Sequence, residues 1–426
     1  MKKHTQPPYE SSEISYKPSG IEWLGEIPKH WEIRRLKYLF YISKEESRDE
    51  FPNVLSLTQN GIIERDITTN KGQLAQNYIG YNIVKRGDII LNPMDLSSGY
   101  AAKSTFEGVI SQAYVKIRPL KTLNLSYYES FFQNLYHYKI LWHLGKGISY
   151  DHRWTLGNDV FLNIKIPLPP LQEQKEIAEF LDKKCEKIQN YIDKKQKLIT
   201  LLQEKKQALI NEVVTKGLNP NIEFKNSGIA YLGLIPHHWE VRRMKFMASI
   251  HNGREQTEIA DENGIYPIYG SGGILGKSMY FIYDKPSVLL GRKGTIDKPL
   301  FVEEPFWTID TMFYTSISKI VLPKYFYYLC LTIDFQFYIS GSAIPSMTQY
   351  DLANISFALP PLQEQKQIAN FLDEKCEKIN SAIEKTKRQI ELIKEYKNTL
   401  INEAVCGRVA CSRDFSPTAQ NDKKKN

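Results

Sequence analysis

Two long segments of the chain carry apolar residues at alternating spacings of three and four, which is the pattern of one face of an α-helix. No Pro or Gly interrupts either segment before Gly217 and Gly407. Each segment therefore predicts one helix of roughly 45 residues, near 70 Å long at 1.5 Å per residue. The apolar stripes consist of Leu181, Cys185, Ile188, Ile192, Ile199, Leu202, Leu209 and Val213 in the first, and of Leu372, Cys376, Ile379, Ile383, Ile390, Ile393, Leu400 and Ala404 in the second.

A helix of this length does not fit inside a small globular domain, so its apolar stripe needs a second long helix as partner. The other copy is the obvious candidate, and we predict that the two form a coiled coil. The alternative is two separate amphipathic helices, each packed on its own domain. The predicted helix–helix seam consists of Leu181, Ile188, Ile192, Leu202, Leu372, Ile379, Ile383 and Ile393.

The helix entries are repeated in sequence. Residues 168–192 (LPPLQEQKEIAEFLDKKCEKIQNYI) match residues 359–383 (LPPLQEQKQIANFLDEKCEKINSAI) at 19 of 25 positions, with an offset of 191. Pro-Pro suits the first turn of a helix, because proline lacks an N–H that would be unpaired there. Glu173 and Glu364 then place negative charge where the helix dipole favours it. One structural unit is therefore used twice.

A second repeat lies upstream of each helix. Residues 20–37 (GIEWLGEIPKHWEIRRLK) match residues 228–245 (GIAYLGLIPHHWEVRRMK) at 12 of 18 positions, with an offset of 208. The ends of the two halves, which we call the frames, are thus alike, whereas the inserts 38–167 and 246–358 are unlike. Similar frames with dissimilar inserts indicate that the frames bind the same partner and that each insert recognises something different. Unconstrained drift of loops is the alternative.

Both inserts are predicted to be mixed and rich in strands. Residues 54–67 predict a hairpin about Asn60-Gly61, and residues 81–93 a second strand pair that turns at Arg86-Gly87-Asp88. The second insert contains short β-like runs broken by Gly-rich turns over 264–283, 287–302 and 305–316. Each insert ends in an aromatic stretch, 126–144 and 323–340, which we expect to be helical and packed in a core.

The composition excludes some classes of protein but does not indicate a function. The 426 residues are 42% hydrophobic and 24% charged, as in a soluble protein of two to four domains, and hold no run of about 18 apolar residues. The first residues, MKKHTQPPYESSE, lack the apolar stretch of a secretory signal. Five cysteines without a Cys-x-x-Cys pair favour reduced thiols in the cytoplasm. The net charge of +8 permits a polyanionic partner without requiring one.

Two motifs imitate catalytic signatures. Asn92-Pro93-Met94-Asp95 is like the Asn-Pro-Pro-aromatic motif of amino-methyltransferases, but its fourth residue is Asp and no glycine-rich cofactor loop accompanies it. Residues 271–278 (SGGILGKS) miss the phosphate-binding P-loop only at the first position, yet a β-like run follows where a helix should begin. The eight histidines show no metal-ligand spacing. We therefore expect neither a catalytic centre nor a metal site.

The repeated LPPLQEQK helix entries, the GIEWLGEIPKHWEIRRLK frame and inserts such as GIYPIYGSGGILGKSMYFIYDKPSVLLGRKGT resemble the specificity (S) subunit of type I restriction-modification systems, over about residues 20–409. The resemblance implies a non-catalytic DNA-binding subunit without a cofactor of its own. Each recognition domain would bind one half of a bipartite, asymmetric DNA sequence, and the helices would form an antiparallel coiled coil. Two methyltransferase subunits, which hold S-adenosylmethionine, would dock on the helical region, and restriction subunits would join the full complex.

This reading predicts an α+β chain with an internal pseudo-two-fold. Its parts are disordered tails at 1–19 and 410–426, target-recognition domains at 20–168 and 219–359, and conserved helices at 169–218 and 360–409. Candidate DNA contacts are polar or basic residues at predicted turns, because Arg suits guanine, Asn or Gln suits adenine, and Lys suits phosphate. They are Gln59, Arg65, Asn92, Ser98, Lys103, Arg254, Ser271, Lys277, Arg292 and Lys293. An isolated enzyme and a coiled-coil adaptor without DNA binding remain as alternatives.

Overall fold

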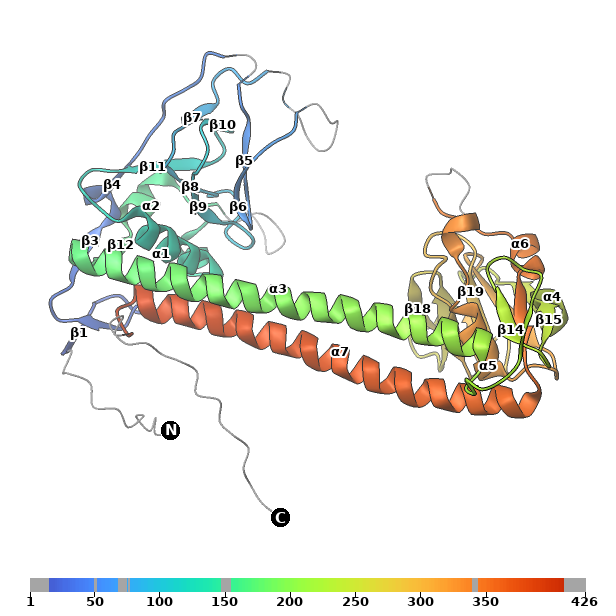
Figure 1. Cartoon of the computed structure of the whole chain (residues 1–426). Coiled ribbons are helices and arrows are strands. Elements are labelled where there is room, and N and C mark those ends of the chain that lie inside the picture. Colours follow the sequence, from blue (N-terminus) through green and yellow to red (C-terminus); the bar gives the residue numbers. More distant parts are fainter. Residues whose placement is uncertain are drawn as a thin grey trace. The chain divides into compact units, whose positions relative to one another are not determined.

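The computed structural model describes residues 15–49, 52–67, 75, 77–146, 155–338 and 344–409 (Figure 1). The chain divides into two compact units. Unit 1 comprises residues 1–193 and 389–426, and unit 2 comprises residues 194–388. The two long helices α3 (Leu171–Lys216) and α7 (Leu362–Val405) each contribute one part to either unit. Each unit is therefore built from both halves of the sequence.

The long helices lie side by side within each unit (Figure 1), and apolar residues of both belong to one core. In unit 1, Leu181 and Ile188 of α3 share a core with Leu400 near the end of α7. In unit 2, Ile210 near the end of α3 shares a core with Leu372 near the start of α7. Early residues of one helix thus meet late residues of the other, so the helices are antiparallel. The predicted antiparallel helix pair and the α+β class are confirmed.

The helix ends follow local chemistry. The first helical hydrogen bonds run from Gln174 N to the Pro170 carbonyl and from Gln365 N to the Pro361 carbonyl, both 3.0 Å. The second proline of each pair therefore lies just before the helix rather than in its first turn, where we had expected it. Gly217 and Gly407 end the helices with φ of 75° and 74°, a left-handed conformation that glycine adopts without strain.

Unit 1 is organised around a four-stranded antiparallel sheet in the order β4-β11-β8-β9. Helix α1 packs against it through Tyr127, Tyr128, Phe131 and Phe132, all fully buried. The first part of the predicted stretch 126–144 is therefore helical and core, whereas Tyr138, which follows α1, is 43% exposed. The sheet and helix elements are β4 (Phe40–Ile42), β8 (Ile89–Leu91), β9 (Ala101–Lys103), β11 (Val115–Pro119), α1 (Leu125–His137), η2 (Trp142–Leu144) and α2 (Asn158–Asn163).

Short strand pairs complete unit 1. The frame and the residues next to it contribute β1 (Tyr16–Pro18) with β2 (Glu26–Pro28), η1 (Leu36–Tyr38), and β3 (Glu32–Arg35) with β12 (Lys165–Leu168), which closes the insert. The insert adds β5 (Leu55–Thr58) with β6 (Gly61–Glu64), which is the predicted hairpin, and β7 (Asn82–Val84) with β10 (Gly108–Ile110).

Two expectations for unit 1 are wrong. β7 and β8 do not pair with each other, because β7 pairs with β10 while β8 joins the central sheet. The turn between them is held instead by Asp88, whose carboxylate accepts a hydrogen bond from Lys85 N at 2.8 Å. Residues 15–19 are not a disordered tail, since Tyr16 lies in β1 and its hydroxyl donates to the Gly407 carbonyl at 3.3 Å. The rest of both predicted tails, 1–14 and 410–426, lies outside the described residues.

Unit 2 has the corresponding sheet in the order β16-β22-β19-β20 and a three-stranded sheet β18-β17-β21. Its elements are β13 (Phe224–Asn226), β14 (Leu234–Pro236), β15 (Glu240–Arg243), α4 (Met244–Met247), β16 (Ala248–Asn252), β17 (Tyr266–Gly270), β18 (Gly273–Ser278), β19 (Ser287–Gly291), β20 (Leu300–Val302), β21 (Trp307–Thr308), β22 (Met312–Ile317), α5 (Pro323–Cys330), η3 (Phe335–Tyr338), α6 (Gln349–Asn354) and β23 (Ser356–Leu359).

The two inserts share a topology that their sequences hide. Strands β4, β8, β9 and β11 correspond in chain order and sheet order to β16, β19, β20 and β22, and each sheet is followed by an aromatic helix, α1 or α5. The frame strands β3 and β12 likewise correspond to β15 and β23. The inserts differ in their additional strands, β5, β6, β7 and β10 against β17, β18 and β21. Their divergence is therefore concentrated outside a common sheet.

Candidate nucleic-acid interface

In each unit two candidate contacts lie on the same connection, the loop that follows β8 or β19, an inner strand of the sheet. Asn92 comes directly after β8 and Ser98 lies further along the β8–β9 loop. Arg292 and Lys293 come directly after β19, at the start of the β19–β20 loop. Because the two sheets have the same strand order, these loops occupy equivalent places in the two units.

Side-chain hydrogen bonds shape the β8–β9 loop. Asn92 Oδ1 accepts from Met94 N at 3.0 Å, and Asp95 Oδ1 accepts from the backbone N–H groups of Ser97 and Ser98, each at 3.0 Å. These are Asx turns, which Asn and Asp form readily. A Cβ at Gly99 would lie 2.0 Å from the Asp95 carbonyl oxygen, so only glycine fits this close approach. These hydrogen bonds and this close approach therefore fix the conformation of the loop.

The tip of the β5–β6 hairpin joins this loop. Gln59 Nε2 donates to the Ser98 carbonyl, and Ser98 Oγ donates to the Asp95 carboxylate. Arg65, which is half-buried, lines a pocket of about 590 Å³ together with Asn92. Unit 1 thus brings together four predicted residues: Gln59, Arg65, Asn92 and Ser98.

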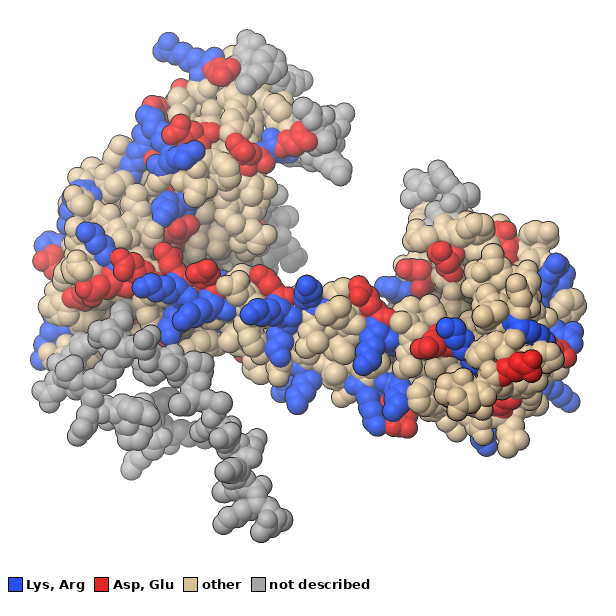
Figure 2. All heavy atoms as spheres, in the orientation of Figure 1, with Lys and Arg blue, Asp and Glu red and all other residues tan. Residues whose placement is uncertain are grey.

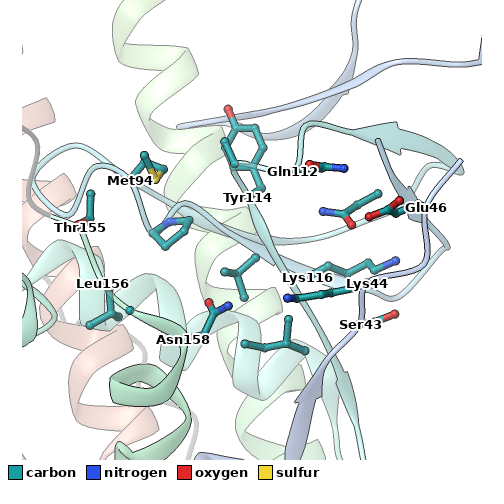
Figure 3. Close-up of a pocket in the computed structure, with 16 residues that line it drawn as sticks. Ser43, Lys44, Glu46, Met94, Gln112, Tyr114, Lys116, Thr155, Leu156 and Asn158 are labelled. Atoms are coloured by element: carbon teal, nitrogen blue, oxygen red, sulfur yellow. The ribbon is translucent and has the colours of Figure 1, made fainter. Parts of the chain in front are cut away.

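A second pocket, of about 560 Å³, lies beside the first (Figure 3). Met94 and Tyr114 line both pockets, so they form the wall between them. The further polar residues of the second pocket come from strand β11 and its flanks, from the segment after β4 and from the start of α2; they include Ser43, Lys44, Glu46, Gln112, Lys116 and Asn158. Two polar hollows therefore flank Tyr114 next to the β8–β9 loop.

Lys116 is 1% exposed although it carries an ammonium group. Its Nζ donates to the Ile83 carbonyl, and burial lowers the pKa of the ammonium. Next to it, Arg118 binds Asp88 through Nε at 2.6 Å and Nη2 at 2.9 Å, and Glu45 through Nη1 at 2.9 Å. The hydrogen bond from Arg118 lowers the pKa of Glu45. This network ties the segment after β4 and the β7–β8 turn to the central sheet.

In unit 2 the β19–β20 loop meets the β17–β18 turn. Arg292 N donates to the Thr311 carbonyl at 2.9 Å, and Arg292 Nη1 donates to the Asp310 carbonyl at 3.2 Å. The Arg292 guanidinium lies 6.0 Å from the centre of the Phe313 ring. A Cβ at Gly294 would lie 3.1 Å from Ser271 Oγ, which places Ser271 beside this loop. Ser271, Arg292 and Lys293 are therefore neighbours, and Arg292 is positioned rather than freely solvated.

Three predicted residues lie elsewhere. Arg254 is exposed on the loop after β16, where its carbonyl accepts from Trp307 Nε1 at 3.0 Å. Lys277 is exposed on β18 opposite Pro267, roughly 13 Å from the turn at Ser271 at 3.4 Å per residue. Lys103 Nζ donates to Ser126 Oγ of α1 at 2.5 Å, so its ammonium faces the helix.

The predicted seam residues lie on the paired helices. Leu181, Ile188, Leu372 and Ile383 are buried, whereas Ile192, Leu202, Ile379 and Ile393 are half-buried. Figure 2 shows acidic and basic side chains interspersed along the outer faces of the helices. The assignment of individual residues to the seam stays a prediction.

Sequence reasoning missed Tyr114, Gln112, Lys44, Asn158 and Lys116. Lys116 alternates with Val115 and Ile117 along β11, a pattern typical of an exposed lysine, yet all three side chains are buried. The others line a pocket built from segments far apart in sequence, for which no local signal exists.

The two motifs that imitate catalytic signatures are part of ordinary turns and loops. Ser271-Gly272 forms the tight turn between β17 and β18, and residues 273–278 continue as a strand, so no helix begins there. Asn92-Pro93-Met94-Asp95 is the start of the β8–β9 loop. Within the described ranges, no three His, Cys, Asp or Glu side chains gather as a metal site would need. Among the same residues, no helix is long and apolar enough to cross a membrane.

The family model of the type I restriction modification DNA specificity domain matches residues 28–202 and again 236–392. The MjaVIII type I restriction enzyme specificity subunit of Methanocaldococcus jannaschii is 25% identical, over 90% of this chain and 94% of its own length. The putative MjaX type I restriction enzyme specificity subunit of the same organism is 24% identical, over 91% and 95%.

A similar solved structure comes from work on complex assembly and conformational transition of the type I R-M system. It aligns with a TM-score of 0.69 and 14% identity over 90% of this chain and 99% of that chain, which supports the fold alone. The two family matches cover most of the sequence and contain both candidate loops. The chain belongs to the type I restriction modification DNA specificity family, as a non-catalytic specificity subunit with two DNA recognition domains.

Proposed function

We propose that unit 1 recognises one half of a bipartite, asymmetric DNA target through the β8–β9 loop and that unit 2 recognises the other half through the β19–β20 loop. The observation that carries this proposal is the occurrence of polar and basic residues on the same strand connection in both units. The two loops differ in sequence while the frames agree, as two different half-sites held by one scaffold require.

The chemistry of each loop suits base edges and phosphates. In unit 1, Gln59 and Asn92 carry amides that suit adenine, Ser98 adds a hydroxyl, and Arg65 suits guanine or phosphate. In unit 2, Arg292 suits guanine, while Lys293 and Ser271 suit phosphate. Arg254 and Lys277 are exposed and extend the phosphate contact. We assign Lys103 to holding β9 against α1, because its ammonium is bonded to Ser126.

The partners follow from the same proposal. Two methyltransferase subunits dock on the paired helices and frames and methylate adenines of the target, with S-adenosylmethionine held by those subunits. Restriction subunits join through the same complex. Since it binds cellular DNA, the chain works in the cytoplasm. The recurrence of frame and helix entry in both halves supports two copies of one partner.

The test is DNA binding by the specificity subunit with its methyltransferase subunits, on a duplex that carries the methylated motif found by single-molecule sequencing of host DNA. Arg292→Ala should cost about 1–3 kcal/mol on this duplex and relax selection at one base pair of one half-site. Lys293→Ala should weaken binding to all duplexes and lower the slope of log affinity against log salt by about 1.

Lys285→Ala is the matched control, because Lys285 is exposed and precedes β19, at the opposite end of the strand from Arg292. It should leave base selection unchanged. If Arg292→Ala kept full affinity and selection, the β19–β20 loop would not be the recognition element. Absence of any salt-dependent DNA affinity in the unmodified complex would favour an adaptor without DNA binding.

A further inference from the structure

An exposed aromatic ring with a lysine beside it directly follows the frame repeat in both halves. Tyr38 is 61% exposed and Phe246 is 57% exposed, and the two are equivalent because each is the first residue after the frame repeat. We call the surroundings the basic–aromatic patch. It consists of Arg35, Lys37, Tyr38 and Lys121 in unit 1, and of Arg243, Lys245, Phe246 and Lys319 in unit 2.

The geometry of the basic–aromatic patch is the same in the two units. Lys37 Nζ lies 5.5 Å from the centre of the Tyr38 ring, and Lys245 Nζ lies 5.4 Å from the centre of the Phe246 ring. The residue after β11 or β22 lies beside the chain next to each ring, because Leu120 N donates to the Leu39 carbonyl and Ser318 N to the Met247 carbonyl, both 2.8 Å. Lys121 and Lys319 directly follow these residues.

The cations of the patch differ from their neighbours in lacking an acidic partner among the described residues. The neighbouring arginines, Arg34 and Arg242, are paired at 2.8 Å with Glu32 and Glu240 of their own strands. In contrast, none of the cations of the basic–aromatic patch forms an ion pair with a described residue. The cation–π contact of each exposed ring contributes only about 0.5–1 kcal/mol, so the repetition of ring and unpaired cations points to a contact outside the chain.

That contact is not one that distinguishes DNA sequences, because the patch is the same in both units while the recognition loops differ. The cations require an acidic partner surface. Paired bases in a duplex offer no face for stacking, and a phosphate backbone offers no apolar surface to a ring. Aromatic and arginine side chains are instead typical anchors of protein interfaces. The ring therefore favours a protein partner over the DNA backbone.

We propose that each basic–aromatic patch is a docking site for one methyltransferase subunit, which presents an acidic surface with an apolar centre. The proposal rests on the proposed function, in which two such subunits bind one specificity subunit. Tyr38 and Phe246 are the anchors, and the flanking cations align the partner by charge. The two patches are independent sites, one in each unit.

The experiment measures how many methyltransferase subunits bind the full chain, by native mass spectrometry and by titration. Lys37→Glu with Tyr38→Ala should weaken one site by about 30-fold or more, so that the complex carries one methyltransferase subunit instead of two. Lys245→Glu with Phe246→Ala should do the same at the other site, and the four-fold variant should bind neither. Circular dichroism melts should stay nearly unchanged, since Tyr38, Lys245 and Phe246 are exposed and Lys37 is only half-buried.

The matched control is Lys285→Glu with Tyr350→Ala, which removes an exposed cation and a ring that is 77% exposed outside the patch. It should keep both methyltransferase subunits. If the four-fold variant still bound two with unmodified affinity, the docking proposal would be overturned. A fall in DNA affinity with normal assembly would assign the patch to phosphates. If the unmodified chain bound no methyltransferase subunit, the proposed function itself would fail.

Discussion

Trp31 Nε1 donates a hydrogen bond of 2.8 Å to Glu173 Oε2, and this bond ties the frame of unit 1 to the start of α3. His30 Nε2 lies 2.6 Å from the other oxygen of the same carboxylate. Unit 2 repeats the arrangement, with Trp239 3.0 Å and His238 2.6 Å from the oxygens of Glu364. The frame repeat therefore supplies the Trp and His of this contact, and the helix repeat supplies the Glu.

Replacement of Glu173 by Ala should lower the free energy of unfolding by about 1–3 kcal/mol, because Trp31 is buried and its N–H would lose its acceptor. Glu364→Ala should have a similar effect through Trp239. Urea denaturation followed by circular dichroism measures both. Glu179→Ala, an exposed carboxylate later on α3, is the control. Equal stability of Glu173→Ala and the control would show that the contact does not hold the frame.

The glycines that end the helices should differ in their tolerance of a methyl group. At Gly407 a Cβ would lie 2.6 Å from Pro28 Cδ and 2.8 Å from Trp31 Cη2, whereas at Gly217 its closest contact would be Trp239 Cζ2 at 3.1 Å. Both have positive φ, which costs about 1–2 kcal/mol for a non-glycine residue.

We therefore expect Gly407→Ala to lower the melting temperature more than Gly217→Ala does, because only the former also clashes with backbone-constrained Pro28. Differential scanning calorimetry measures both transitions. Gly272→Ala, at a turn with nothing within 4 Å of the added carbon, should leave the melting temperature nearly unchanged. The reverse order of the first two variants would contradict the packing of Trp31 on the end of α7.

The buried Lys116 predicts a pH dependence. Burial lowers its pKa in the folded state below the ordinary value of 10.5, so the unfolded chain holds this proton more tightly. Folding stability therefore rises with pH, from the folded pKa of Lys116 up to about 10.5. In the Lys116→Met variant this rise of folding stability with pH should be absent. The free energy of unfolding of the unmodified chain, minus that of the variant, should increase from pH 7 to about 10.5, whereas a constant difference would contradict the burial of the charge.

The long helices and frames could be predicted from sequence because their signals are local. Three local signals predict α3 without knowledge of the rest of the chain. They are apolar residues at spacings of three and four, Pro-Pro before Leu171, and Gly217 after Lys216. Strand pairing is not local, and so the predicted pairing of β7 with β8 was wrong.

The common sheet of the two inserts was missed for a related reason. Ile89 and Leu91 of β8, like Val288 and Leu290 of β19, pack into the main core of their unit. Such positions require only an apolar side chain, so the two strands share a pattern of apolar residues but few identical residues. The candidate loops could be located by their turn residues. Tyr114 and Lys116 could not, because their surroundings are assembled by tertiary structure.

The most direct test of the account exchanges one insert. Residues 40–164, from the start of β4 to the residue before β12, are replaced by the corresponding segment of a relative, which leaves the frame, Tyr38 and both long helices unchanged. Single-molecule sequencing then reports the methylated adenines and their context in cells that carry the hybrid. The account predicts a motif in which one half changes and the other half is retained. A motif with both halves changed, or with neither changed, would contradict it.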